Sequence, residues 1–204
     1  LFKKNERCDL RVIKMNNWSR DLKFNETEYP WVPTSPHVPF YETPFYMVAT
    51  GILGELGIFS VGVGYTIPFQ VIAAPWIESD ILADKMNELE LKGVFFRPIN
   101  FTPYYSLYKG QSIGGVQIHI EDFENVNLFS IQFYFLQIHN MLYPDKNAFE
   151  LASNSNIVMF DKAIGSTQLR MKIAKTNDYD AIKHIVDKDV QNFKIKKLSY
   201  HLYE

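Results

Sequence analysis

The sequence predicts an α/β or α+β fold in which a mixed sheet is covered by helices. Two observations carry this prediction. Short apolar runs typical of strands interleave with amphipathic runs typical of helices, and the carboxy-terminal part of the chain is helical in pattern. With 204 residues, the chain is long enough for one large domain or for one domain and part of another.

Four segments have the pattern of strands. Phe69–Ala74 is an apolar run that predicts a buried strand, and Val116–Glu121 alternates between apolar and polar residues. Val94–Phe101 is a third strand, which Pro98 marks as an edge or a bulge because proline donates no hydrogen bond to a neighbouring strand. Cys8–Met15 alternates more weakly and predicts a fourth.

Five segments have the spacing of helices. The first starts at Thr43-Pro44, since proline is well tolerated in the first turn of a helix, and places Glu55 near its end. Polar residues 147–155 predict a surface connection. The predicted helices are Thr43–Leu53, Ser79–Leu91, Asn127–Leu142, Thr167–Lys175 and Tyr179–Lys197.

Composition excludes several functional classes. The formal net charge of -2 gives no basic footprint for nucleic acid. The single cysteine, Cys8, excludes an internal disulfide and a site built from several cysteines. No apolar run approaches the ~20 residues that cross a bilayer. The chain begins at Leu1 without a signal peptide, as if partway through a domain, so we expect an amino-terminal part to be missing.

A glycine-rich stretch, residues 50–76, is the most informative part of the sequence. It surrounds one acid, Glu55, with Gly51, Gly54, Gly57, Gly62 and Gly64. Glycine permits backbone angles that other residues resist, and it lets a ligand or another backbone approach closely. The stretch therefore predicts a loop that faces a ligand, or else a tight turn with glycines that pack against a helix.

Several short pieces occur in an order that resembles a known family. They are Pro30–Pro36, the glycine-rich stretch with Pro68-Phe69 and Ala74–Ile77, Gly93–Pro98, Phe101–Pro103, Gly115–Ile118, Tyr143-Pro144, Phe160-Asp161 and the closing residues 200–203. In this order they resemble the carboxy-terminal half of the bacterial exo-β-N-acetylmuramidases, the NamZ-type glycoside hydrolases of peptidoglycan recycling. The resemblance is collinear over almost the entire chain.

The resemblance implies a protein of two domains with the site in the cleft between them. Residues 1–30 would be the end of the amino-terminal domain or a connector, and residues 31–204 would be the carboxy-terminal domain. The Rossmann-like first domain, which by resemblance holds the main catalytic carboxylate, is absent from this chain. That missing domain is the expected protein partner.

The family's loop pattern also implies site residues. Glu55, Ser60, Gly62 and Gly64 match it, whereas its asparagine, second glutamate, arginine and threonine are absent, and Val63 replaces the arginine. Glu55 is the expected catalytic carboxylate, either as a proton donor or by binding sugar hydroxyls and orienting the partner acid. Alternatively, the Glu55 carboxylate has a structural role and accepts hydrogen bonds from the backbone amides of the loop. The expected substrate-binding residues are Ser60, Gly62, Gly64, Tyr65 and His37.

The implied function is removal of terminal N-acetylmuramic acid from peptidoglycan fragments. The substrate would be a peptidoglycan-derived sugar or muropeptide, with no cofactor and no metal, in the cell envelope, periplasm or secreted fraction. This chain alone is not expected to be active. A non-catalytic glycan-binding or envelope interaction domain is the alternative, because the loop has lost several polar groups.

Overall fold

A computed structural model of the chain describes residues 9–203, which form two compact units. The larger unit is Trp31–Lys188, and the smaller one combines Leu1–Pro30 with Asp189–Glu204. Among residues 9–203, no helix has the length and apolar character needed to span a membrane.

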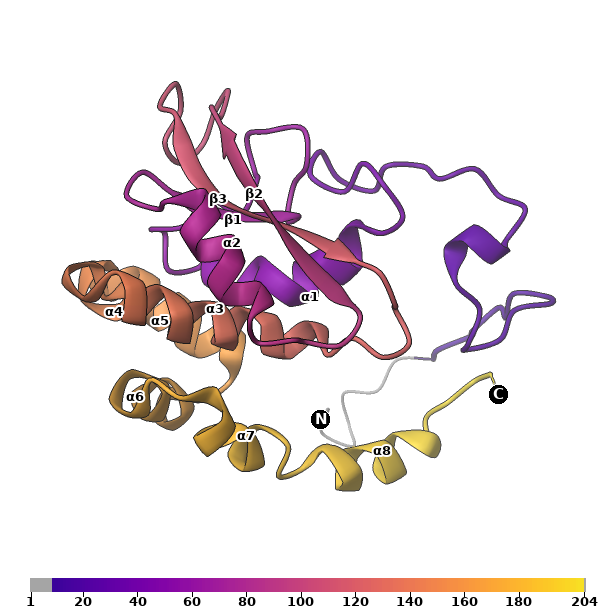
Figure 1. The fold of residues 1–204 in the computed structure, drawn as a ribbon. Helices are drawn as coiled ribbons and strands as arrows, with labels where there is room; N and C mark the ends of the chain where they lie inside the picture. Colours follow the sequence, from indigo (N-terminus) through magenta and orange to yellow (C-terminus); the bar gives the residue numbers. More distant parts are fainter. Residues whose placement is uncertain (1–8, 204) are drawn as a thin grey trace. The chain divides into compact units, whose positions relative to one another are not determined.

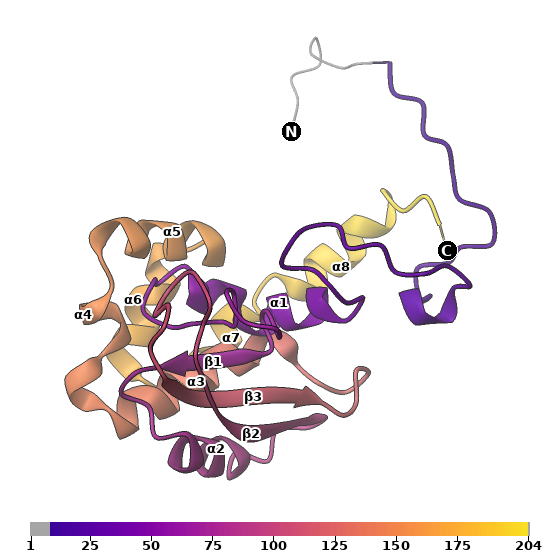
Figure 2. The same ribbon diagram turned by 90° about the horizontal axis from the view of Figure 1, so that it is seen from above.

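The larger unit contains a three-stranded antiparallel sheet in the order β1-β3-β2 (Figures 1 and 2). The strands are β1 (Val71–Ala74), β2 (Val94–Phe101) and β3 (Ile113–Ile120). Of the two predicted classes, α+β is confirmed, but the expected mixed sheet is wrong for the described residues. A helix connects β1 to β2, so these strands run in the same direction, but β3 lies between them and is antiparallel to both.

Three helices pack on one face of the sheet. They are α1 (Thr43–Gly54), α2 (Ser79–Asn87) and α3 (Leu128–Leu142), and their apolar side chains share one core with Ile72, Val116 and Ile118 of the strands. On the opposite face, a smaller cluster joins Val71, Ala73, Phe101 and Ile113 to side chains from the loops. The glycine-rich stretch therefore serves both faces, because it contributes to each cluster.

The first two predicted helices form, with different ends. α1 starts at Thr43-Pro44 as predicted, and Glu55 is its carboxy-terminal cap residue. α2 ends at Asn87 and not at Leu91, because the Asn87 side chain leaves the helix to bond β2. Its Nδ2 donates to the carbonyl of Phe96 at 2.8 Å, and its Oδ1 accepts from the Phe96 N–H at 2.9 Å. A side chain thus occupies the outer edge of β2.

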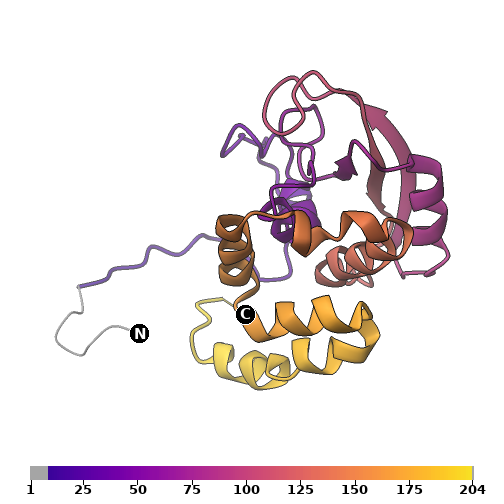
Figure 3. The same ribbon diagram turned by 90° about the vertical axis from the view of Figure 1, so that its left-hand side faces the viewer.

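The later helices of the larger unit are short and well capped. After α3 come η2 (Pro144–Lys146), α4 (Ala148–Leu151), α5 (Asn154–Ile164), α6 (Thr167–Thr176) and α7 (Tyr179–Val186). The predicted connection at 147–155 therefore contains α4 and the start of α5, with Asn147 and Ser153 as amino-terminal caps. α5 lies beside α1 and α6, and α7 lies beside α3 (Figure 3).

The smaller unit contains η1 (Phe24–Glu26) and α8 (Val190–Leu198). Two predictions fail here. Residues 9–15 form no strand, since no other described segment pairs with them, and Cys8 lies outside the described residues. The single helix predicted for Tyr179–Lys197 is two helices, because Asp187–Asp189 interrupts it where the two units divide. Aspartate disfavours a helix interior and favours its ends.

Candidate functional site

Glu55 lies where α1 ends and the glycine-rich loop begins. Its neighbours Leu53 and Leu56 are fully buried in the core, so the position of the Glu55 backbone is fixed on both sides. The Glu55 side chain itself is half-buried. Among residues 9–203, its carboxylate has no hydrogen-bond or ion-pair partner. A partly enclosed carboxylate with free acceptor positions can bind a ligand donor.

An asparagine from α5 holds the end of α1 in place. Asn156 Nδ2 donates to the Glu55 carbonyl oxygen at 2.8 Å, across 101 residues of sequence. The Asn156 side chain also fills the space beside Gly57, whose φ of 67° is in the left-handed region that glycine tolerates. Gly57 thus lets the chain turn sharply after Glu55 while Asn156 packs against the turn.

A cavity of about 330 Å³ lies directly against Glu55. Three parts of the larger unit form it: the end of α1, the glycine-rich loop and the loop between β2 and β3. The lining residues are Gly51, Gly54, Glu55, Gly57, Phe59, Ser60, Val61, Val63, Phe69, Ser106 and Leu107. Glu55 is the single acid in this lining, and its other members are apolar residues, glycines and two serines.

Ser60 is brought to the same cavity as Glu55. Its backbone forms a bridge to Ala73 on the outer edge of β1, with hydrogen bonds of 2.8 and 2.9 Å in the two directions. The Ser60 hydroxyl accepts from the Gly62 N–H at 3.4 Å. Two of the six predicted site residues, Glu55 and Ser60, therefore line one hollow.

Gly62 and Gly64 do not line the cavity. Both have positive φ, 80° and 98°, and the space that a side chain would take is filled by backbone oxygens of Ile67 and Tyr105, respectively. The carbonyl of Gly64 also accepts from the Tyr104 N–H at 2.7 Å. The structure thus uses Gly62 for a tight turn within its own loop and Gly64 for close packing against the loop between β2 and β3, which is the tight-turn alternative predicted from the sequence.

Tyr65 and His37 lie outside the cavity lining as well. Tyr65 packs on Phe101 at a ring-centroid distance of 4.6 Å, in the smaller cluster on the other face of the sheet. His37 Nδ1 is 3.2 Å from the hydroxyl of Tyr105, which is the chain neighbour of the cavity residue Ser106. His37 therefore supports the loop that borders the cavity.

Sequence reasoning missed Ser106 and Leu107 in this lining. Both follow β2 in a loop about fifty positions after Glu55, and no spacing in the sequence links the two regions. The sequence predicts Phe69 as the first residue of a buried strand, yet Phe69 precedes β1, has φ of 65° and donates its N–H to the Val61 carbonyl at 2.6 Å. This turn directs Phe69 to the cavity.

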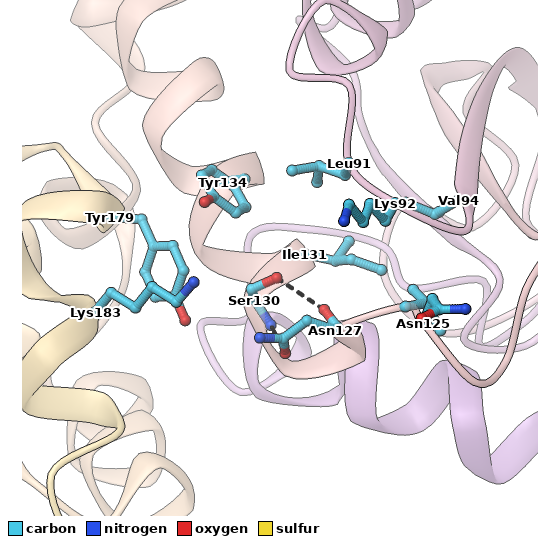
Figure 4. A pocket seen from close by; sticks show the side chains of 11 residues that line it. Leu91, Lys92, Val94, Asn125, Asn127, Ser130, Ile131, Tyr134, Tyr179 and Lys183 are labelled. Carbon is cyan, nitrogen blue, oxygen red and sulfur yellow. Dashed lines mark hydrogen bonds between the residues drawn. The ribbon is translucent and has the colours of Figure 1, made fainter.

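A second hollow, of about 190 Å³, lies at the opposite end of the sheet (Figure 4). It includes Val94, the first residue of β2, whereas the cavity at Glu55 borders the loop that follows β2. Lys92 and Lys183 lie at its sides, and Tyr134 donates to Asp180 at 2.8 Å. Burial and Asp180 raise the pKa of Tyr134, so this phenol stays protonated. None of the predicted site residues contacts this hollow.

One acid at a cavity supplies half of what a glycoside hydrolase needs, because these enzymes usually place two carboxyl groups around the bond that they cleave. Among the residues that the structure describes, no group of three or more His, Cys, Asp or Glu side chains is placed to hold a metal ion.

Comparisons with known proteins place the chain in a family. Residues 45–203 match the family described as "Exo-beta-N-acetylmuramidase NamZ, C-terminal", and residues 1–42 match its N-terminal counterpart. The chain therefore belongs to the NamZ exo-β-N-acetylmuramidase family, as the sequence predicted.

Two relatives show how much of the family the chain covers. It is 34% identical over 196 residues to the peptidoglycan β-N-acetylmuramidase NamZ of Bacillus subtilis, covering 96% of this chain and 46% of that protein. A crystal structure of a DUF1343 family protein from Bacteroides fragilis is similar with a TM-score of 0.93 and 43% identity, covering 97% of this chain and 51% of the other. The chain thus spans about half the length of these relatives.

Proposed function

We propose that this chain is part of an enzyme that removes terminal N-acetylmuramic acid from peptidoglycan fragments, and that its cavity at Glu55 forms one wall of the sugar site. The observation that carries the proposal is a half-buried, unpaired carboxylate against a cavity of about 330 Å³ in a chain of this family. The Bacillus subtilis relative, a peptidoglycan β-N-acetylmuramidase, supports the choice of substrate.

The composition of the cavity wall indicates what another part of the site must supply. Hydrolysis of a glycosidic bond normally needs a second carboxyl group, and Glu55 is the only acid in this lining. N-acetylmuramic acid also carries a lactyl carboxylate, which calls for a cation or several N–H donors. No Lys, Arg or His lines the cavity. We therefore assign the second carboxyl group and the cation to the amino-terminal domain of the family.

The apolar part of the wall has its own role in this proposal. Val61, Val63 and Phe69 give the cavity a surface suited to the acetyl methyl group of the sugar, while Glu55 and Ser60 accept or donate to its polar atoms. The family's loop arginine is replaced by Val63 here, so the lactyl group would be bound elsewhere. An enzyme of this kind would work in the cell envelope, periplasm or secreted fraction, where its substrate is found.

The test is the substitution Glu55→Gln in the intact protein, with release of N-acetylmuramic acid from a chromogenic glycoside as the readout. If Glu55 transfers a proton, kcat falls by ~10²-fold or more with little change in KM. If it binds sugar hydroxyls, KM rises while kcat is kept. The matched control, Glu90→Gln, alters an exposed acid outside the cavity and should leave both constants unchanged. Unchanged kinetics in Glu55→Gln would remove this residue from the site.

A non-catalytic glycan-binding role is the second candidate, and one observation favours it. The cavity lining holds a single acid, so this chain by itself lacks the usual pair. Calorimetry with muropeptides, run beside the turnover assay on the intact protein, separates the two functions. Heat of binding without release of sugar would favour the binding role.

A further inference from the structure

The loop between β2 and β3 is closed on itself and tied to the glycine-rich loop beside it (Figure 3). The Gly110 N–H donates to the Pro103 carbonyl at 2.9 Å, which joins the two ends of the loop. The Tyr108 hydroxyl donates to the Ile58 carbonyl at 2.9 Å, next to the cavity residue Phe59. A compact surface loop whose ends are joined in this way is frequently functional.

The same loop is held in a backbone conformation that most residues avoid. Ser106 and Tyr108 have φ of 68° and 61°, in the left-handed region, and neither is glycine. Such conformations persist only where the surrounding structure fixes them, and they cluster at ligand sites. In this loop the strained residue Ser106 lines the cavity at Glu55. The loop is therefore a rigid part of the cavity wall.

Two aromatic rings of this loop are exposed although their positions are fixed. Tyr104 and Tyr105, directly before Ser106, are 71% and 48% exposed. Tyr104 stacks on Tyr65 with a ring-centroid distance of 6.1 Å and an angle of 20° between the rings. The Tyr105 hydroxyl lies 3.2 Å from His37 Nδ1. A tyrosine ring that is both fixed and exposed offers a large contact surface at little cost in conformational entropy.

The size of the cavity separates a terminal sugar from the rest of its chain. A volume of about 330 Å³ is at the lower end of the range for ligand pockets, which suits one sugar and not several. An enzyme that removes the terminal sugar must therefore hold the next one outside this cavity. Tyr104 and Tyr105 adjoin the lining at Ser106, and the C–H groups of a pyranose ring pack well on the face of an aromatic ring.

We propose that Tyr104 and Tyr105 form an aromatic platform for the sugar on the leaving-group side of the scissile bond, an N-acetylhexosamine. The inference rests on the proposed function for the placement of the terminal sugar in the cavity at Glu55, and it adds the part of the site that recognises the leaving group. Tyr65 and His37, both expected from the sequence to bind substrate, act in this arrangement as positioning residues for the two rings.

Kinetics with two substrates test the platform in the intact protein. One substrate is the disaccharide of N-acetylmuramic acid with N-acetylglucosamine, and the other is the methyl glycoside of N-acetylmuramic acid, which has no sugar ring on the leaving-group side. In the double variant Tyr104→Ala/Tyr105→Ala, kcat/KM should fall ~10-fold or more for the disaccharide and change less than ~2-fold for the methyl glycoside.

Two further variants serve as controls. Tyr104→Phe/Tyr105→Phe keeps both ring faces and loses the hydroxyl that contacts His37, and it should retain the kcat/KM of the unmodified protein for the disaccharide. Phe95→Ala removes a ring of similar exposure, 45%, near the start of β2 and outside the cavity lining. This variant should leave kcat/KM for both substrates unchanged.

A binding measurement on the 204-residue chain needs no enzymatic activity. Titration with N-acetylglucosamine, followed by the NMR signals of the tyrosine rings, should give a Kd on the order of 1–10 mM. The double alanine variant should bind this sugar ~10-fold more weakly or not at all, because the ring faces are gone. The double phenylalanine variant, observed through its phenylalanine rings, should keep the affinity.

Three results would overturn the platform. The first is an equal fall in kcat/KM for both substrates in the double alanine variant, which assigns the rings to the terminal sugar or to folding. The second is unchanged kcat/KM for the disaccharide in that variant. The third is N-acetylglucosamine binding that is absent from the unmodified chain or unaffected by loss of the rings. Lack of turnover by the unmodified intact protein would instead remove the proposed function, while ring-dependent sugar binding would still support the platform.

Discussion

Single residues of the glycine-rich stretch have structural roles that differ from those their types suggest. Gly62 and Gly64 match the family's loop pattern, yet in this structure they let two backbones approach closely. Glu55 and Ser60, in contrast, face the same hollow. At this scale, a residue's type predicted where the chain must turn, whereas only the folded chain distinguishes a turn that faces a ligand from one that faces another loop.

Substitution of Gly64 should be costly. Gly64→Ala forces a side chain into a φ of 98° and against the Tyr105 carbonyl, so we expect a loss of ~3 kcal/mol or more in the free energy of unfolding. The control is Gly110→Ala, which has a φ of 76° but open space, and should cost ~1 kcal/mol. Urea unfolding of both variants measures the difference, and equal losses would show that the contact with Tyr105 is unimportant.

His139 should make the protein sensitive to acid. It is fully buried, its Nε2 accepts from Trp76 Nε1 at 3.0 Å, and burial lowers its pKa from 6.5 to about 4. Between these pH values the unfolded chain binds more protons, so the free energy of unfolding rises with pH from about 4 to 6.5. The full change is ~3 kcal/mol.

The measurement is urea unfolding as a function of pH. His139→Gln keeps an acceptor for Trp76 but cannot titrate, so this variant should lose most of the slope between pH 4 and 6.5. His184→Gln, at an exposed position on α7, is the control and should keep the slope. The same slope in His139→Gln and the unmodified protein would assign the acid sensitivity to other groups.

At the scale of elements, pairs of helices are joined by a few specific side chains. Asn156 ties α5 to the end of α1, and a two-bonded ion pair between Arg170 and Asp161 ties α6 to α5. The Arg170 guanidinium lowers the pKa of the Asp161 carboxyl. The first tie holds the end of α1, where Glu55 lies, and the second holds α5 in turn, so the geometry of the cavity depends on contacts outside its lining.

Loss of the Asn156 tie should loosen the end of α1. Asn156→Ala removes the hydrogen bond to the Glu55 carbonyl and the packing beside Gly57, with an expected cost of ~1–2 kcal/mol. Asn154→Ala, an exposed position in the first turn of the same helix, is the matched control and should cost little. Hydrogen exchange at the amides of residues 55–57 should speed up only in Asn156→Ala; similar exchange in both variants would contradict the assigned tie.

Elements were predictable where local signals and tertiary contacts agree. Thr43-Pro44 starts α1 as expected, because proline suits a first turn whatever the surroundings. The break at Asp187–Asp189 is not predicted, because the apolar spacing typical of a helix continues through these residues. The helices on either side of the break belong to different units, α7 to the larger one and α8 to the smaller one. Ser106 and Leu107 reach the cavity only through the pairing of β2 with β3, which no local pattern contains.

At the scale of the whole molecule, the hydrophobic core belongs to one unit. Every hydrophobic residue that is buried in the described chain lies between Ala49 and Ile182. We therefore expect residues 31–188 to fold without the rest. Their thermal unfolding should be cooperative, with a melting temperature within ~5 °C of that of the whole chain. A broad, non-cooperative transition in this truncated protein would show that the smaller unit is needed for folding.

Both edges of the small sheet are closed to another strand. Ser60 bonds the free side of β1 at Ala73, and on the free side of β2 the Asn87 amide bonds Phe96, two residues before Pro98, which has no N–H. An incoming polypeptide would find few backbone groups to extend the ladder. An extended peptide would accordingly have to be recognised at this sheet through its side chains and charges and not by strand addition, and the same closure protects the domain from aggregating edge to edge.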